Sequence, residues 1–141
     1  MKHKILIVDD EENILFVVKE AFVAGYDVFT AKDGETALEI IRREKPSFIF
    51  LDIKMPGMSG VEVLELIKDT GATPIVWMLT GDDSLDTAMQ TLSGGASGYI
   101  TKPFDLARIR AVVAGALLDL EQDKKARAQE EKPWHVEKKT K

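Results

Sequence analysis

The sequence contains no cysteine, only two histidines, and no apolar run that approaches the length of a membrane span. The lack of cysteine excludes disulfides and thiolate metal sites, and two histidines leave little basis for a zinc site. The basic start, MKHK, is followed by only four apolar residues before Asp9, too few for the core of a signal peptide. We therefore expect a cytoplasmic protein with no membrane segment.

Positive charge is also in the minority. The formal net charge is -5, which argues mildly against nucleic acid as a direct partner. A hydrophobic content of 45% with 30% charged residues is typical of a soluble globular protein. A chain of 141 residues is long enough to bury one proper core, so we expect a single folded domain.

Short apolar runs alternate with stretches of helical spacing along the chain. The runs, rich in Ile, Val and aromatic residues, are Ile5–Val8, Tyr26–Thr30, Phe48–Leu51, Ile75–Leu79 and Tyr99–Thr101. The helical faces are Ile14, Leu15, Val18, Ala21 and Phe22; Ala37, Leu38 and Ile41; Val61, Leu64 and Ile67; Leu85, Ala88, Met89 and Leu92; and Leu106, Ile109, Val113, Ala116 and Leu117. Because the middle runs are continuously apolar, the pattern predicts an α/β fold, a doubly wound five-stranded parallel sheet between two layers of helices.

Polar side chains follow four of the five apolar runs. In such folds ligands bind outside the carboxyl ends of the strands, so these side chains should meet at one edge of the sheet. Taken singly, each has an ordinary explanation, such as a helix N-cap, a turn or a loop. Their convergence on one edge is not expected by chance. The candidate site residues are Asp9, Asp10, Asp52, Thr80 and Lys102.

This set of groups suits phosphoryl transfer with a bound divalent cation. Neighbouring carboxylates repel one another, and a hard cation with oxygen ligands, Mg²⁺, relieves that repulsion. Asp52, on the central strand, is the best-placed nucleophile for an aspartyl phosphate. Lys102 can neutralise phosphoryl oxygens, the Thr80 hydroxyl can donate to one of them, and Gly81 leaves room for the group.

The motifs at these positions resemble the receiver domain of two-component response regulators. The resemblance runs from residue 3 to about residue 120, and it is carried, in order, by ILIVDDEEN, FIFLDIKMPGMSG, MLTG and YITKPF. It implies a flavodoxin-like, CheY-like three-layer sandwich with strand order 2-1-3-4-5. It also implies a cis peptide before Pro103.

The resemblance assigns roles to the site residues. It implies that Asp52 accepts a phosphoryl group from a histidine kinase or a phosphotransfer protein, and that Lys102 binds that group. Asp10 and Asp52 would ligate Mg²⁺ with the backbone carbonyl of Lys54, and Asp9 would act partly through water. Mn²⁺ is a possible substitute for Mg²⁺. No organic cofactor is expected.

The resemblance further implies a signalling switch and not a metabolic enzyme, one that assists only its own phosphoryl transfer and autodephosphorylation. Thr80 and Tyr99 would form the switch pair and alter the face built from the fourth helix, the fifth strand and the fifth helix. That face would act on a downstream protein target or a missing output domain, or support a phosphorylation-linked dimer. Lys54 and Asp82 rim the site and could pair, so the lifetime of the phosphoryl group stays open.

Three rival readings fit the residues less well. A nucleotide- or flavin-binding protein needs a phosphate cradle after the first strand, where this chain has Asp9-Asp10-Glu11-Glu12 and no GxGxxG. A phosphatase with an Asp nucleophile would space its acidic pair as DxD. A receiver domain that only binds partners, without phosphorylation, remains an alternative.

The chain divides into a receiver domain, residues 1–120, and a charged segment, residues 121–141. The segment loses the apolar periodicity, so we expect a solvated helical extension or tail, or alternatively a truncated linker to an output domain. Residues beyond about Lys132 are expected to be mobile.

Overall fold

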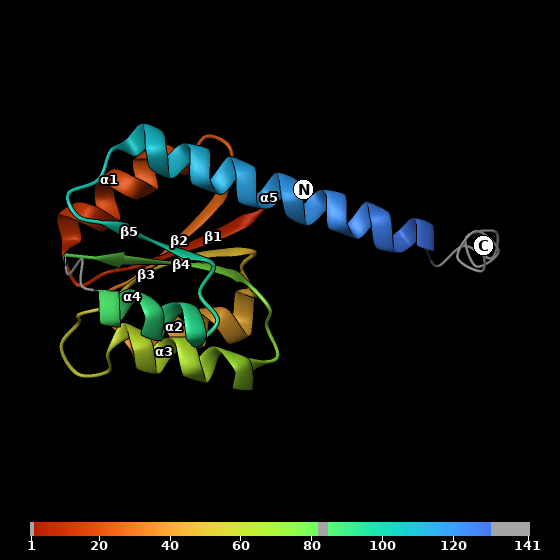
Figure 1. The fold of residues 1–141 in the computed structure, drawn as a ribbon. Helices are drawn as coiled ribbons and strands as arrows, with labels where there is room; N and C mark the ends of the chain where they lie inside the picture. Colours follow the sequence, from red (N-terminus) through yellow and green to blue (C-terminus); the bar gives the residue numbers. More distant parts are fainter. Residues whose placement is uncertain (1, 82–84, 131–141) are drawn as a thin grey trace.

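A computed structural model describes residues 2–81 and 85–130 and the side chains of 2–81 and 86–122. Strands and helices alternate through this part of the chain (Figure 1). The strands are β1 (Lys4–Val8), β2 (Asp27–Ala31), β3 (Phe48–Asp52), β4 (Ile75–Thr80) and β5 (Gly98–Thr101). The helices are α1 (Glu12–Phe22), α2 (Gly34–Glu44), α3 (Gly60–Ile67), the 3₁₀ helix η1 (Lys68–Thr70), α4 (Leu85–Ser93) and α5 (Leu106–Glu130).

The five strands form one parallel sheet in the order β2-β1-β3-β4-β5. Helices α1 and α5 cover one face, and α2, α3 and α4 lie on the other (Figure 1). The predicted doubly wound α/β fold, a flavodoxin-like three-layer sandwich, is therefore confirmed. No helix within the described residues is both long and apolar enough to cross a membrane.

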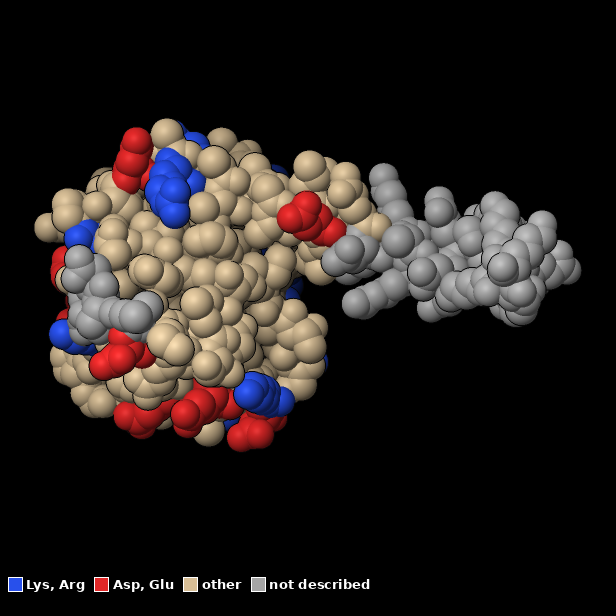
Figure 2. Space-filling view, in the orientation of Figure 1, with Lys and Arg blue, Asp and Glu red and all other residues tan. Residues whose placement is uncertain are grey.

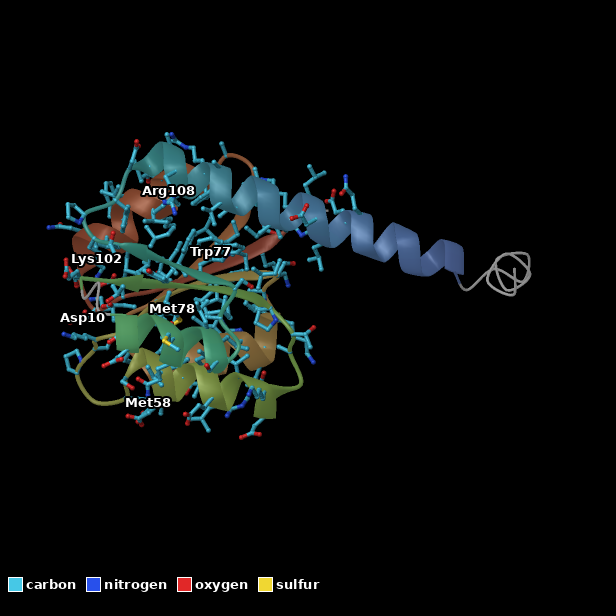
Figure 3. The ribbon with its side chains drawn as sticks, in the orientation of Figure 1. Asp10, Met58, Trp77, Met78, Lys102 and Arg108 are labelled. Atoms are coloured by element: carbon cyan, nitrogen blue, oxygen red, sulfur yellow. The ribbon has the colours of Figure 1, made fainter. Side chains whose placement is uncertain are left out.

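The central strands contribute side chains to two hydrophobic cores, because neighbouring side chains of a strand point to opposite faces. Ile5 and Ile7 of β1 pack with α1 and α5, while Leu6 and Val8 pack with α2 and α3. All five residues of β3 are buried. Trp77 and Met78, neighbours in β4, likewise point to opposite sides of the sheet (Figure 3). Trp77 is partly buried and packs against the α1–α5 core.

The predicted inner face of α4 is partly wrong. Ala88 is buried as expected, but Met89 and Leu92 are 57% and 44% exposed. Thr91 is completely buried in their place, and its hydroxyl donates to the Ala88 carbonyl oxygen at 3.0 Å. A hydroxyl that is satisfied by its own helix can be buried at low cost, so apolar spacing alone selected the wrong face.

Helix α5 keeps the predicted inner face and then continues beyond it. Ile109, Val113 and Leu117 are buried, and the helix runs on to Glu130, away from the sheet (Figure 1). The expectation of mobility beyond Lys132 concerns residues outside the described part of the chain. The peptide bond between Lys102 and Pro103 is cis, as the family resemblance implied.

Candidate functional site

Asp52 is the last residue of the central strand β3 and is only 3% exposed. Its position is fixed on both sides of the residue. Strand pairing places it opposite Leu79, and the next amide, of Ile53, donates to the Leu79 carbonyl at 3.0 Å. The chain then turns back so that the Gly60 amide donates to the Ile53 carbonyl at 2.8 Å. Asp52 is thus held by backbone pairing, with little freedom to move away from its neighbours.

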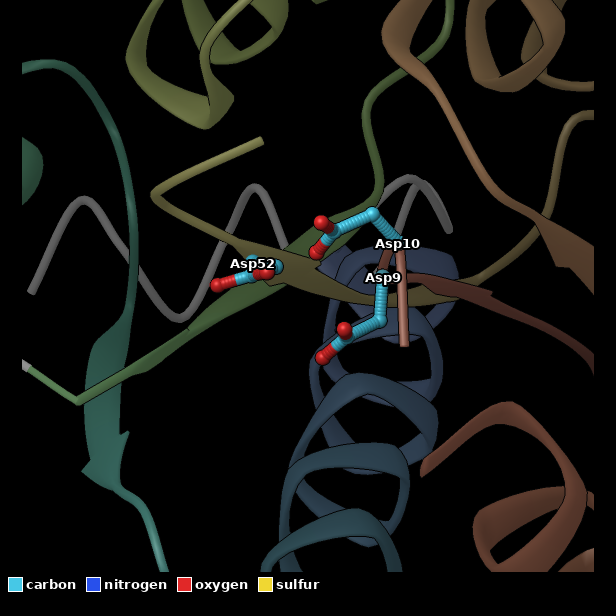
Figure 4. A group of neighbouring side chains, drawn as sticks. All are labelled: Asp9, Asp10 and Asp52. Atoms are coloured by element: carbon cyan, nitrogen blue, oxygen red, sulfur yellow. The ribbon is translucent and has the colours of Figure 1, made fainter. Parts of the chain in front are cut away.

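Three carboxylates meet at the carboxyl edge of the sheet. Asp9, Asp10 and Asp52 each offer one oxygen, and these oxygens lie within 4.8 Å of one another (Figure 4). Asp9 is completely buried, whereas Asp10 is exposed. Asp9 Oδ1 accepts the amide of Glu11 at 2.9 Å, which turns the chain from β1 into α1. The predicted acidic cluster therefore exists, with two members shielded from water and one facing it.

Lys102 is the cation of this cluster. Its Nζ lies 2.8 Å from Asp9 Oδ2, 3.5 Å from Asp52 Oδ1 and 3.9 Å from Glu11 Oε1, and its side chain is 16% exposed. The contact with Asp9 Oδ2 has the distance of a strong ion pair but not the angles of a good hydrogen bond. We treat it as an ion pair, because Coulomb attraction depends on distance far more than on angle.

The arrangement shifts the pKa of both central groups. Burial, followed by the charge of Asp9, raises the pKa of Asp52 to about 7, although Lys102 opposes the shift. Burial by itself would lower the pKa of Lys102. The contacts with Asp9 and Asp52 outweigh it, so the net shift of the Lys102 pKa is upward. One lysine therefore does not offset three neighbouring carboxylates.

The donor set fits a hard divalent cation. Asp9 Oδ2 is buried and makes no hydrogen bond within the described part of the chain. Carboxylate oxygens are the ligands that Mg²⁺ prefers, and sulfur and imidazole ligands are lacking here. Receiver domains generally bind Mg²⁺ at an acidic pocket of this kind. Lys54 is exposed and lies two residues after Asp52, between the buried residues Ile53 and Met55.

Thr80 and Tyr99 occupy different positions along their strands. Thr80 ends β4 and is 2% exposed, and its carbonyl accepts the Lys102 amide at 2.7 Å. It pairs in register with Thr101, which places Tyr99 two residues back along β5. Tyr99 is half-buried and lines a cavity of about 590 Å³ together with Trp77. Thr80 therefore lies at the carboxyl edge of the sheet, and Tyr99 lies on the edge strand β5.

Comparison with known proteins decides the family. A family model, the response regulator receiver domain, matches residues 5–114. The chain belongs to the receiver domain family of response regulators. It is 39% identical over 114 residues to sporulation initiation phosphotransferase F of Bacillus subtilis, covering 80% of this chain and 92% of that protein.

Other relatives are longer than this receiver domain. The chain is 39% identical over 118 residues to the Bacillus subtilis alkaline phosphatase synthesis transcriptional regulatory protein PhoP, covering 83% of this chain but only 49% of PhoP. Among solved structures, a CheY-like response regulator receiver domain protein from Methanospirillum hungatei JF-1 superposes with a TM-score of 0.82 at 31% identity. That match covers 87% of this chain and 99% of the other.

The receiver domain also contains two residues of the site that sequence reasoning missed. A Cβ on Gly60 would lie 2.0 Å from the Asp52 carbonyl oxygen, so only glycine lets α3 start against the end of β3. The other is Glu11, the third carboxylate near Lys102. The second glycine of MPGMSG and the acid that follows Asp9-Asp10 were visible signals. Asp82 lies outside the described residues, and so does its predicted pairing with Lys54.

Proposed function

We propose that this receiver domain is a phosphorylation-dependent switch in which Asp52 accepts a phosphoryl group. Receiver domains are phosphoacceptor switches and not classical enzymes. The observation that carries the proposal is the surroundings of Asp52, a carboxylate held rigid at a strand end, 3.5 Å from Lys102 and beside two further carboxylates. Phosphoryl transfer needs mainly such positioning and charge neutralisation.

In this proposal one Asp52 oxygen attacks phosphorus while the bond from phosphorus to the donor breaks, giving an acyl phosphate. The donor is a histidine kinase or a phosphotransfer protein. Lys102 neutralises phosphoryl oxygens, and the Thr80 hydroxyl donates to one of them. Asp10, Asp52 and the Lys54 carbonyl would hold Mg²⁺, or Mn²⁺ in its place, with Asp9 acting partly through water. When bound, the cation would offset the charge of the carboxylates and the phosphoryl group.

We further propose that the face formed by α4, β5 and α5 transmits the change. Thr80 would move toward the phosphoryl group, and Tyr99 would follow into the space that Thr80 leaves. The side chains in view over the middle of the molecule are largely uncharged (Figure 2), and Met89 and Leu92 of α4 are exposed. Such a surface suits a protein target, an output domain or a second copy more than nucleic acid.

Labelling with a small phosphodonor in the presence of Mg²⁺ tests the proposal. One phosphoryl group should be added to each chain, stable in acid and labile in base, as expected of an acyl phosphate. Asp52→Asn keeps the shape but removes the nucleophile, so labelling should vanish while the circular dichroism spectrum is unchanged. Labelling of Asp52→Asn at the wild-type level, or a phosphorylated hydroxyl residue, would contradict the mechanism.

A second variant separates acceptance of the phosphoryl group from transmission. Lys102→Ala should still be labelled, more weakly, because Asp52 remains. The environment of Tyr99, followed by NMR, should then change on phosphorylation in the wild type but not in the variant. The same Tyr99 response in both proteins would show that Lys102 is not needed to pass on the change.

A further inference from the structure

The N-terminus of α1 differs from those of α2 and α3. Asp33 caps α2 by accepting the Thr36 amide at 2.8 Å, and Ser59 caps α3 by accepting the Glu62 amide at 3.2 Å. The N-cap of α1 is Glu11, whose side chain makes no such hydrogen bond. Glutamate is a poor N-cap compared with Asp, Ser or Thr. Helix α1, which starts at the site, therefore lacks the side-chain cap that α2 and α3 have.

The Glu11 carboxylate lies beside Lys102 instead, with 3.9 Å between Oε1 and Nζ. The neighbouring Glu12 has the same charge and the same helix end, but its carboxylate contacts Lys32. A local choice that weakens a helix end while placing a charge beside a site is the kind of conflict that accompanies function. Glu11 is thus distinguished from Glu12 by what it touches and not by its type.

We propose that Glu11 is a positioning residue that competes with the phosphoryl group for the Lys102 ammonium. The inference rests on the proposed function. The other two carboxylates within 4 Å of Lys102 are those of Asp9 and Asp52, which are assigned there to the cation and the phosphoryl group. Glu11 is the remaining anion, and it stays available because its side chain is 62% exposed at the rim. Removing its charge should release Lys102 for the phosphoryl oxygens.

Two charge-matched variants test this proposal. Glu11→Gln and Glu12→Gln each remove one negative charge from the start of α1, so a general effect of charge on an anionic donor is common to both. Initial rates of phosphorylation are measured with a small phosphodonor and saturating Mg²⁺. Glu11→Gln should react roughly two- to fivefold faster than Glu12→Gln, the range expected for one partly exposed ion contact. Both variants should bind Mg²⁺ as the wild type does.

A Lys102→Gln background identifies the route of the effect. If Glu11 acts through Lys102, then Glu11→Gln should lose its advantage over Glu12→Gln in this background. Equal rates for the two variants in the wild-type background would overturn the inference while leaving phosphorylation of Asp52 intact. A slower Glu11→Gln, or an advantage that persists without Lys102, would overturn it as well. An unlabelled wild type would overturn the proposed function itself.

Thermal stability gives an independent test, because substitutions at Glu11 also change the N-cap of α1. Glu11→Ser introduces a preferred N-cap residue and removes the carboxylate, so it should raise the Tm by roughly 2–6 °C and also raise the phosphorylation rate. Glu11→Asp can also cap the helix, so it should be as stable as Glu11→Ser. Its shorter side chain holds the carboxylate farther from Lys102. A Tm below that of the wild type for Glu11→Ser would show that Glu11 serves the helix and not Lys102.

Discussion

The two edges of the same parallel sheet treat charged groups in opposite ways. At the amino edge, His3 lies 3.0 Å from Glu121 and 3.3 Å from the Ser47 hydroxyl, and Lys4 pairs with Glu44 at 3.1 Å. Both pairs join a basic and an acidic side chain, and all four side chains are partly exposed to water. At the carboxyl edge, the carboxylates of Asp9, Asp52 and Glu11 all lie within 4 Å of the Lys102 ammonium, and Asp9 and Asp52 are buried.

The charged groups of the two edges therefore differ in their effect on stability: those at the amino edge cost little, and those at the carboxyl edge destabilise the folded state. Partly exposed pairs contribute little to stability and cost little. Buried like charges raise the free energy of the folded state and persist only where something else requires them. The pKa of Asp52, raised to about 7 by burial and then by Asp9, expresses that cost.

The largest effect is expected from Gly60→Ala, at the carboxyl edge. The added Cβ would lie 2.0 Å from the Asp52 carbonyl oxygen and 2.8 Å from the Ile53 Cα, and neither backbone atom can rotate away. Unfolding free energy should fall by about 3 kcal/mol or more, as measured by urea denaturation. Gly115→Ala is the control, because nothing lies within 4 Å of its Cβ and alanine favours the interior of α5. A stable Gly60→Ala would contradict the close packing of α3 on β3.

The next largest effect is a pH dependence of stability without metal. The Asp52 pKa of about 7 in the folded protein lies above the ordinary value of 3.8, so the folded state binds the proton more tightly than the unfolded state. The associated stability is complete below about pH 4 and is lost as pH rises toward and through 7. Between pH 5 and 8 the loss should be roughly 2–3 kcal/mol in chelator.

Asp52→Asn isolates this contribution, since an amide does not titrate. The variant should lose less stability than the wild type between pH 5 and 8 and should be the more stable protein at pH 8 in chelator. Denaturation curves at matched ionic strength measure both. Identical pH profiles would mean that the crowded carboxylates do not burden the fold.

Metal affinity gives a third contrast between the edges. Asp10→Ala removes one proposed ligand of the cluster, so Mg²⁺ affinity in a calorimetric titration should fall about tenfold or more. Asp27→Ala removes the same charge from the start of β2, at the amino edge, and should change affinity less than about twofold. Equal losses in the two variants would indicate a general effect of net charge and no defined site.

Much of this molecule could be predicted because its strongest signals are local. The continuous apolar runs place the buried strands within one or two residues, although the run from Tyr26 begins one residue before β2. Parallel strands share one carboxyl edge, so the convergence of Asp9, Asp10 and Asp52 followed from strand order alone. The matching motifs added the family, which the family model confirms.

What could not be predicted depends on contacts between segments far apart in the chain. The need for glycine at position 60 arises where α3 meets the end of β3, and no local pattern contains that distance. The inner face of α4 depends on whether the Thr91 hydroxyl finds a partner. In the sequence Glu11 is an ordinary acid at a helix start, and only the fold brings Lys102, the residue after β5, beside it.

The smallest effect is expected at the amino edge, where His3 joins the start of β1 to Glu121 of α5. The side chain of Glu121 is 54% exposed, so solvent weakens the attraction, and the coupling energy should be below about 1 kcal/mol. A double-mutant cycle with His3→Gln and Glu121→Gln at pH 6 measures it by denaturation, and the cycle cancels other contacts that either residue makes. The coupling should shrink further at high salt. A coupling energy as large as the pH-dependent loss of stability assigned to Asp52 would contradict this difference between the edges. The fold would then depend on charged groups at the amino edge as well.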